Sequence, residues 1–170
     1  MIELELKAPA GPATLERLLA HGDPEERRER DTYHAHPARD FRATDEALRV
    51  RERADGRIEV TYKGPKLDPR TKSRREITLA VDDLDATLAL LESLGFERAF
   101  VIAKRRRVWR IEGFEVSYDE VEGLEPFVEI EKAGATEADV AAFASLAPAL
   151  ADRLGIGASV RASYAELLGH

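Results

Sequence analysis

Short segments in which apolar and charged residues alternate recur along the chain, and a period of two is typical of β-strands. Residues 2–7 read IELELK, with apolar side chains at the even positions and charged side chains at the odd ones. Similar alternation predicts further strands at 47–51, 58–63, 74–79, 103–112, 116–119 and 127–131. Two connections, residues 54–57 and Glu112-Gly113, have the composition of hairpin turns. The pattern predicts a sheet with one apolar and one charged face.

Four other segments have the spacing of helices. Leucines recur on one face in 12–21 and again in 83–94, where the pattern stops at Gly95. Residues 136–154 open with Thr136 and Asp139 at the spacing of a capping box. A last short helix is expected from about 161 to 168, capped by Ser159. The order strand, helix, several strands, helix, several strands, helix predicts an α+β fold.

Strands with one apolar and one charged face allow two arrangements. An open sheet packs its apolar face on a core and exposes its charges, whereas a closed sheet forms a barrel with the charges inside. The charged face carries two Glu and a Lys on the first strand, two Arg on the next and two Glu on the last. A solvent-exposed face is not expected to carry positive residues on some strands and negative residues on others. The distribution therefore favours a barrel with a charged bore and helices against its apolar outside.

Composition narrows the classes of function. With 170 residues, 44% of them hydrophobic and 35% charged, the chain is expected to fold as a single domain, 1–170. A net charge of -7 argues against general binding to nucleic acid or to an anionic membrane, and no apolar run is long enough to cross a bilayer. The absence of cysteine excludes disulfides and thiolate metal sites and agrees with a cytoplasmic location. A metal ion would have to bind carboxylates or one of four histidines.

The charged face has the groups that a triphosphate and a divalent ion require. Arginine and lysine bind phosphate oxygens, and a guanidinium can bind two of them at once. Carboxylates are the hard oxygen ligands that Mg²⁺ favours. The expected cationic wall consists of Lys7, Arg49, Arg51, Lys63, Arg74, Lys104 and Arg106. The expected acidic wall consists of Glu3, Glu5, Glu76, Asp119, Glu129 and Glu131.

These residues carry a resemblance that covers essentially the whole chain. The matching motifs, in chain order, are Glu3-x-Glu5-x-Lys7, Asp31-x-Tyr33 with Pro37-x-x-Asp40-Phe41, Leu48-Arg49-x-Arg51, Thr61-Tyr62-Lys63-Gly64-Pro65, Arg74-x-Glu76, Lys104-x-Arg106, Asp119, Phe127-Val128-Glu129-Ile130-Glu131 and Ser163-Tyr164-x-Glu166-Leu167-Leu168. Each motif is weak alone, but their order and their strand faces are specific. The chain resembles the CYTH superfamily, named for class IV adenylyl cyclases and thiamine triphosphatases and also called triphosphate tunnel metalloenzymes.

The resemblance implies an eight-stranded antiparallel β-barrel, the triphosphate tunnel, with helices packed on its outside. It implies phosphate binding by Lys7, Arg49, Arg51, Lys63, Lys104 and Arg106, to which Arg74 is added by its strand face. It implies binding of Mg²⁺ or Mn²⁺ by Glu3, Glu5, Asp119, Glu129 and Glu131. The residues expected to be catalytic are Glu3, Glu5, Lys7, Arg49 and Arg51. The expected partner is ATP, tripolyphosphate or thiamine triphosphate, with no nucleic acid and no membrane, and the resemblance also allows a homodimer.

Two reactions fit such a tunnel. In a cyclase the ribose 3′-hydroxyl of ATP attacks the α-phosphorus and pyrophosphate leaves, whereas in a triphosphatase water attacks the terminal phosphorus. Both need positioning and charge neutralisation, and no residue stands out as a dedicated general base. The segments 33–40 and 61–65 favour the cyclase-like branch. The alternative from another class is a non-catalytic polyphosphate- or nucleotide-binding module, which would not need the acidic wall.

A few positions depart from the family pattern or have a structural explanation. Thr78 stands where many relatives carry a second acidic residue, and Glu76 fits a salt-bridge partner as well as a metal ligand. Tyr33 and Trp109 are expected to be packing residues, with Trp109 in the core outside the barrel. The four histidines have no metal-ligand spacing and are expected to be structural or surface residues, with His34 the one candidate for a neighbour of the site.

Overall fold

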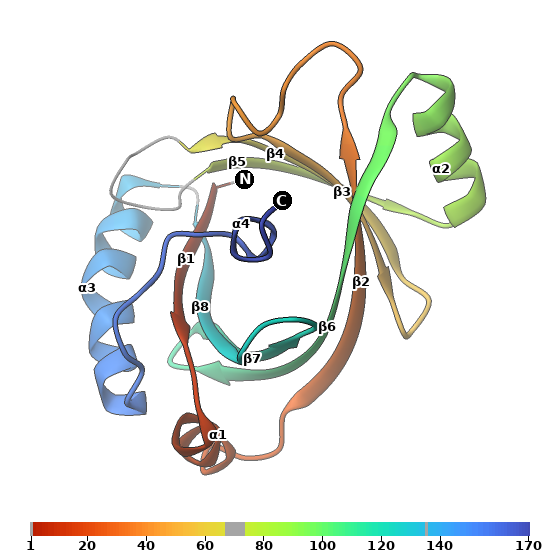
Figure 1. Cartoon of the computed structure of the whole chain (residues 1–170). Helices are drawn as coiled ribbons and strands as arrows, with labels where there is room; N and C mark the ends of the chain where they lie inside the picture. The colour runs from red at the N-terminus through yellow and green to blue at the C-terminus, as the bar shows by residue number, and fades with distance from the viewer. Residues whose placement is uncertain (1, 67–73, 135) are drawn as a thin grey trace.

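Eight antiparallel strands close into a barrel in the computed structural model of the chain (Figure 1). The structure describes residues 2–66, 74–134 and 136–170, without the side chains of residues 2, 3, 66, 133, 134 and 137. Around the barrel the strand order is β1-β5-β4-β3-β2-β6-β7-β8. The strands are β1 (Ile2–Pro9), β2 (Glu25–Ala35), β3 (Ala47–Arg53), β4 (Ile58–Lys66), β5 (Arg74–Val81), β6 (Glu97–Ile111), β7 (Phe114–Val121) and β8 (Phe127–Gly134).

The first strand closes the barrel because it pairs on both sides. β1 runs antiparallel to β8 from Ile2, opposite Gly134, to Pro9, opposite Phe127. On its other side β1 meets the start of β5, where Glu3 lies opposite Arg74. Successive side chains of a strand point to opposite faces, so closure sends the charged positions into the bore and the apolar ones outward. The predicted α+β barrel is confirmed.

Both predicted hairpin turns are present. Glu112 and Gly113 connect β6 to β7 with φ angles of 52° and 82°. Two consecutive residues with positive φ match the right-handed twist of the flanking strands, and glycine adopts this conformation at no steric cost. In the turn between β3 and β4, Gly56 alone adopts a positive φ, of 87°.

Two helices cover the outside of the barrel beside β1 and β8 (Figure 1). α1 (Pro12–Leu19) contacts α3 (Glu137–Leu154), and α3 packs on both strands. The apolar faces of these helices bury Leu18 and Leu150 in one core cluster with Ile130, an outward-facing residue of β8. The prediction that helices pack on the apolar outside is confirmed for this side of the barrel.

The capping box predicted for residues 136–154 and the glycine stop predicted after residues 83–94 are both present. Thr136 and Asp139 form a reciprocal capping box at the start of α3. Asp83 caps α2 (Leu84–Ser93) by accepting a hydrogen bond from a backbone N–H, and Gly95 follows the helix with a positive φ. Within the described ranges, no helix has both the length and the apolar character needed to cross a membrane.

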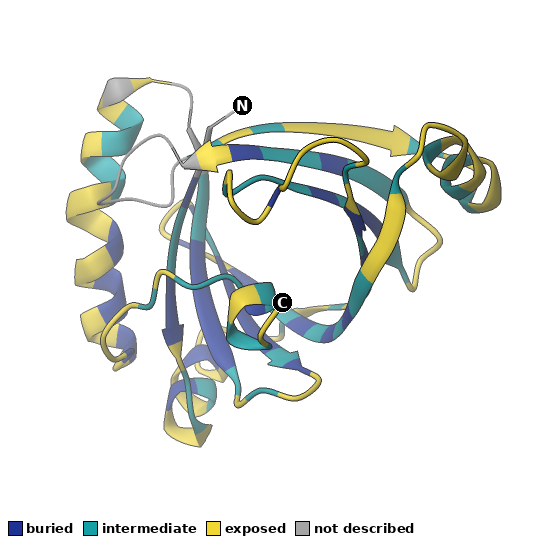
Figure 2. Cartoon of the chain, turned by 45° about the horizontal axis from the view of Figure 1, so that its top comes forward, coloured by how far each residue is buried: buried dark blue, intermediate teal, exposed yellow. Residues whose placement is uncertain are grey.

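The second helix departs from the expected packing. α2 buries none of its side chains, and it lies beside the end of β5 with most of its surface exposed (Figure 2). The leucines of the predicted face, Leu84, Leu88 and Leu91, are each only partly buried. Leu90 and Leu94, which do not belong to that face, are both 60% exposed.

The last helix is shorter than predicted and does not lie on the outside. α4 (Tyr164–Leu167) is capped by Ser163, not by Ser159, and Glu166 completes a capping box. Figure 1 shows it across one opening of the barrel. Tyr164 packs there with inward-facing strand residues, among them Phe127.

The alternation of apolar and charged residues missed one strand. β2 reads EERRERDTYHA and is charged at each of its first seven positions, so no period of two is visible. The barrel places β2 between β3 and β6. Glu29 and Asp31 are buried on the bore side, whereas Arg28 and Arg30 are exposed. A strand can be charged on both faces when one of them lines a polar cavity.

Candidate functional site

The bore contains a cavity of about 810 Å³ that receives side chains from all eight strands. All seven residues of the expected cationic wall line this cavity, and four of them are buried. Alternation along the strands explains the gathering, because residues two apart, such as Arg49 and Arg51, point to the same face. The structure therefore brings together every cation that the sequence placed in the phosphate site.

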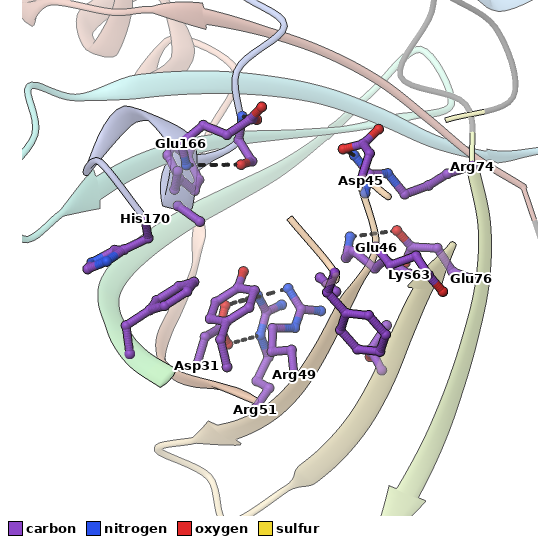
Figure 3. A pocket seen from close by; sticks show the side chains of 18 of the residues that line it. Asp31, Asp45, Glu46, Arg49, Arg51, Lys63, Arg74, Glu76, Glu166 and His170 are labelled. Atoms are coloured by element: carbon purple, nitrogen blue, oxygen red, sulfur yellow. Dashed lines mark hydrogen bonds and ion pairs between the residues drawn. The ribbon is translucent and has the colours of Figure 1, made fainter. Parts of the chain in front are cut away.

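Arg51 on β3 is held by two buried carboxylates of β2. Its Nε and Nη2 donate to the two oxygens of Asp31 at 2.7 and 2.8 Å, and its Nη1 lies 3.0 Å from Glu29. Arg49 contacts the same Asp31 at 3.5 Å, and Figure 3 shows the three side chains together. Asp31 lies opposite Arg51 in the β2–β3 ladder, so the register itself forms the pair. Neither carboxylate belonged to the expected acidic wall, although the Asp31-x-Tyr33 motif was a signal for one of them.

Three carboxylates of β1 and β8 form a cluster in the cavity. One oxygen from each of Glu5, Glu129 and Glu131 lies within 4.8 Å of the others. The Lys7 Nζ is 2.9 Å from Glu129 and 3.5 Å from Glu5, and Arg106 also pairs with Glu129. Burial alone would raise the pKa of Glu129, but Lys7 and Arg106 hold it well below its usual range. The two cations thus keep Glu129 ionised beside the other two carboxylates.

Arg106 on β6 joins this cluster to Asp119 on β7. Its Nε and Nη2 donate to the two oxygens of Asp119 at 2.7 and 2.6 Å. Asp119 is fully buried and also accepts a hydrogen bond from the Tyr164 hydroxyl at 2.8 Å. Asp119, predicted as a metal ligand, is not among the residues that line the cavity or form the three-carboxylate cluster. Its position is that of an anchor for Arg106.

Cationic and acidic residues alternate around the bore, so the expectation of two separate walls is wrong. Each predicted phosphate-binding residue lies within 4.0 Å of at least one carboxylate. Lys63 lies 2.5 Å from Glu76 on the neighbouring strand, and Arg74 lies 3.8 Å from Asp45 (Figure 3). Opposite signs face each other because unpaired buried charges are far more costly than paired ones. Reading each strand separately could not show this pairing.

Two predicted features of the bore remain, the role of Glu3 and the replacement of an acidic residue by Thr78. The side chain of Glu3 lies outside the described residues, so its metal-binding and catalytic roles stay predictions. Thr78, the departure from the family pattern, places its hydroxyl 3.1 Å from that of Thr61 inside the cavity. A neutral hydroxyl pair therefore occupies this part of the bore.

One end of the cavity is lined by several residues of the β2–β3 loop and of the C-terminal segment, among them His170. Tyr33 stacks on Phe100 with 4.7 Å between the ring centroids, and Phe100 stacks on His170 at 4.1 Å. His34 is buried and is not among the residues that line the cavity. It is a structural residue, as expected for the histidines, and not the neighbour of the site that its position allowed. Alternation along β2 turns it away from the face that holds Tyr33.

Trp109 lies in the outer core, as expected. It is 4% exposed and belongs to the same cluster as the helix residues of α1 and α3. Its indole N–H donates to the backbone carbonyl of Gly22 at 2.8 Å. The side chain therefore stabilises the barrel from outside and does not contact the cavity.

The three-carboxylate cluster has the ligand chemistry of a divalent-cation site. Carboxylate oxygens are the hard donors that Mg²⁺ and Mn²⁺ prefer, and Mg²⁺ binds few of them, leaving positions for water or phosphate oxygens. The side chains of Glu5 and Glu131 are 16% and 17% exposed, whereas Glu129 is 4% exposed. An ion could reach the cluster from the cavity, and these three residues would hold it.

Acid should destabilise the fold between pH 4.5 and about 2 through Glu29. Burial alone would raise its pKa, but Lys104 and Arg51 outweigh burial and lower the pKa from 4.5 to about 2. A carboxyl group with a lowered folded-state pKa contributes stability above its unfolded pKa, and loses it as the pH falls through the folded pKa. Urea unfolding at a series of pH values measures this loss. The Glu29→Gln variant should show a flatter acid limb, and an equal slope in both proteins would contradict the assignment.

Comparison with known proteins connects this geometry to a family. The CYTH domain model matches residues 1–164. Over 94 residues the chain is 47% identical to a Methanocaldococcus jannaschii protein that carries the name putative adenylate cyclase MJ0240. That match covers 55% of this chain and 53% of the relative, so the chain aligns with about half the length of this curated protein.

Solved structures share the whole fold. The PH1819 protein from Pyrococcus horikoshii OT3 superposes with a TM-score of 0.92 at 35% identity, covering 98% of this chain and 97% of that one. The structure of HpAC1 from Hippeastrum, described as revealing a dominant triphosphatase activity, superposes with a TM-score of 0.71. It is 20% identical and covers 99% of this chain and 94% of the other, a likeness that shows the fold alone. The family model and the full-length match to PH1819 show that this chain belongs to the CYTH domain family.

Proposed function

We propose that the chain is a divalent-metal-dependent enzyme acting on a triphosphate in the bore, as an adenylyl cyclase that converts ATP to cyclic AMP and pyrophosphate. The observation that carries the proposal is one cavity whose lining includes all seven predicted cations and the cluster of three carboxylates. A triphosphate needs the first group and its metal ion needs the second. The name of the Methanocaldococcus jannaschii relative supports the cyclase reaction in particular.

The cations of the bore are held in place before a ligand arrives. Asp31 and Glu29 fix Arg51, and Asp119 fixes Arg106. A guanidinium has five N–H donors, of which a bidentate carboxylate engages two, so each retains donors for phosphate oxygens. Prepositioned donors lose little freedom when a substrate binds and stabilise charge as it develops. The carboxylate partners thus serve the site by orienting the cations.

The proposed cyclase step forms a bond between the ribose 3′-oxygen and the α-phosphorus and breaks the bond from that phosphorus to the bridging oxygen of pyrophosphate. The proton of the 3′-hydroxyl is proposed to leave through water to a carboxylate of the bore. The proposed role of Lys7, Arg51 and Arg106 is to bind the phosphate chain and stabilise the negative charge that accumulates on the leaving pyrophosphate. A cation held by Glu5, Glu129 and Glu131 would supply Lewis-acid neutralisation of phosphate oxygens. With the cation bound, the negative charge of the three carboxylates would no longer repel the substrate.

A triphosphatase is the second candidate. HpAC1 has the same fold and is described as having a dominant triphosphatase activity, although its 20% identity makes this an argument from the fold. The same cations and carboxylates would serve water attack on a terminal phosphorus. One fold can host both reactions, so the activity has to be measured.

Product analysis separates the candidates. Purified protein should be incubated with Mg²⁺ or Mn²⁺ and, separately, ATP, tripolyphosphate or thiamine triphosphate, and the products resolved by ion-exchange chromatography. Cyclic AMP with pyrophosphate from ATP is the expected result, and chelation of the metal should abolish it. Orthophosphate as the main product would instead identify a triphosphatase. Tight metal-dependent binding without any product would make the chain a non-catalytic binding module.

A further inference from the structure

The C-terminal segment reaches into the charged bore at one residue, Tyr164. This tyrosine begins α4, is 8% exposed and lines the cavity from the end of the barrel that α4 covers (Figure 1). Its ring packs edge-on against Phe127 with 5.7 Å between the centroids. The segment is far from the β1 motif in sequence, yet it contacts the lysine of that motif directly.

Lys7 is enclosed by this segment from two directions. Its Nζ lies 3.8 Å from the centroid of the Tyr164 ring, a cation–π distance. Its backbone carbonyl accepts a hydrogen bond from the Val160 N–H at 2.7 Å. The carboxylates of Glu129 and Glu5 occupy other sides of the ammonium group, at 2.9 and 3.5 Å. A flexible four-carbon side chain is thereby confined to one position.

The Tyr164 hydroxyl fixes the ring and connects it to a second cation. It donates to Asp119 at 2.8 Å, and the same carboxylate binds Arg106 through two hydrogen bonds. Burial raises the pKa of Tyr164, and the nearby Glu129 and Asp119 raise it further, so the hydroxyl keeps its proton and remains a donor. One side chain thus touches both the ammonium of Lys7 and the anchor of Arg106.

We propose that Tyr164 is a positioning residue of the active site: its ring face holds the Lys7 ammonium and its hydroxyl holds the Asp119–Arg106 pair. This inference rests on the proposed function, because it assumes that Lys7 and Arg106 act on a triphosphate. It adds Tyr164 to the residues that shape the site, in a segment that also covers one end of the barrel. The ring and the hydroxyl have separable tasks, and that separation provides the test.

The test compares Tyr164→Phe, Tyr164→Leu and Leu168→Ala with the unchanged protein. Phenylalanine keeps the ring under Lys7 and loses only the hydroxyl, so kcat should stay within about fivefold of normal. Leucine fills the space without an aromatic face, so kcat should fall about 10- to 30-fold, and KM should rise as well because phosphate binding weakens. Leu168 packs in the same apolar cluster without contacting Lys7, and Leu168→Ala should lower Tm at least as much as Tyr164→Leu while kcat stays within about twofold.

Activity that follows Tm across the variants, or equal kcat in the leucine and phenylalanine variants, would overturn the inference. A rise in KM without a fall in kcat in Tyr164→Leu would also overturn it, because that result would indicate only a less ordered opening of the cavity. If the unchanged protein turns over no triphosphate with Mg²⁺ or Mn²⁺, the proposed function fails independently of Tyr164.

Two measurements test the contact itself without turnover. The Lys7 ε-methylene protons, assigned by their loss in Lys7→Arg, should show an upfield ring-current shift that persists in Tyr164→Phe and disappears in Tyr164→Leu. Calorimetric binding of tripolyphosphate should weaken about tenfold in Tyr164→Leu and remain normal in Leu168→Ala. An unshifted Lys7 signal or equal binding in both variants would refute the positioning role even in a protein that only binds.

Discussion

Replacing Arg106 with methionine should lower the free energy of unfolding by about 3–5 kcal/mol and abolish turnover. The Arg106 side chain is 6% exposed, and it pairs with Asp119 and Glu129 and lies 3.5 Å from Glu131. Burial would lower the pKa of Arg106, but these carboxylates raise it well above its ordinary value, so its charge is permanent. Methionine leaves the carboxylates of Asp119, Glu129 and Glu131 with too few cations to compensate their negative charge. Urea denaturation measures the loss of stability.

The effect of Arg106→Met should depend on pH in a defined direction. Without the guanidinium, the carboxylates of the variant should have raised pKa values and take up protons more readily in the folded state. The stability difference from the unchanged protein should therefore narrow as the pH is lowered, because protonation removes the uncompensated charge. A difference that widens in acid would contradict the proposed origin of the effect.

Arg105→Met is the matched control. Arg105 is the preceding residue on β6, its side chain is 40% exposed, and it pairs on the surface with Glu26, which is 52% exposed. Exposed ion pairs contribute little, so this variant should lose little stability and keep its activity. Equal losses in the two variants would mean that general loss of charge, and not the buried cluster, controls the fold.

Glu5→Gln should reduce kcat on the order of 100-fold or more and weaken metal binding, with little loss of stability. Glutamine has the shape of glutamate but lacks its charge, so the variant removes one of the three clustered carboxylates without leaving a cavity. The fold should tolerate this change because two carboxylates still compensate Lys7 and Arg106. Steady-state kinetics at increasing Mg²⁺ gives the activity, and Mn²⁺ titration followed by electron paramagnetic resonance gives ion binding directly.

The control for this variant is Glu59→Gln. Glu59 lines the same cavity from β4 and pairs with Arg53 at 3.0 Å, outside the three-carboxylate cluster. The Glu59→Gln variant should keep kcat within about threefold of the unchanged protein and bind Mn²⁺ with normal affinity. Normal turnover and normal Mn²⁺ affinity in Glu5→Gln would remove the cluster from the site and with it the proposed metal dependence.

Motif order and strand alternation were enough to place seven cations in the bore. Arg49 and Arg51 were assigned to one face because a strand repeats every two residues, and the structure places both in the cavity. Glu5, Glu129 and Glu131 were placed on the same charged face, and their oxygens lie together, while their role in metal binding stays a prediction. The faces were predicted correctly because a face depends on the periodicity of a single strand.

Asp119 and β2 show where such reasoning ends. The alternation put Asp119 on the bore face correctly, but the position of Arg106 across the ladder makes the carboxylate an anchor beneath that guanidinium. β2 escaped detection because charges on both faces hide its period, and its Glu29 and Asp31 were missed with it. Which charges neutralise each other depends on the neighbouring strand, which alternation within one strand does not specify.

The sequence by itself determined the class of fold, the faces of seven strands and seven of the cations in the bore, because each follows from local periodicity and from motifs within one segment. Only the tertiary structure decided the pairing of charges and the place of α4. The register between strands put Arg51 opposite Asp31, and barrel closure put β1 beside β8, so that Lys7 faces Glu129. The packing of α4 over one opening brought Tyr164 to Lys7. Contacts between residues distant in sequence arise from closure and packing, and these are properties of the whole barrel.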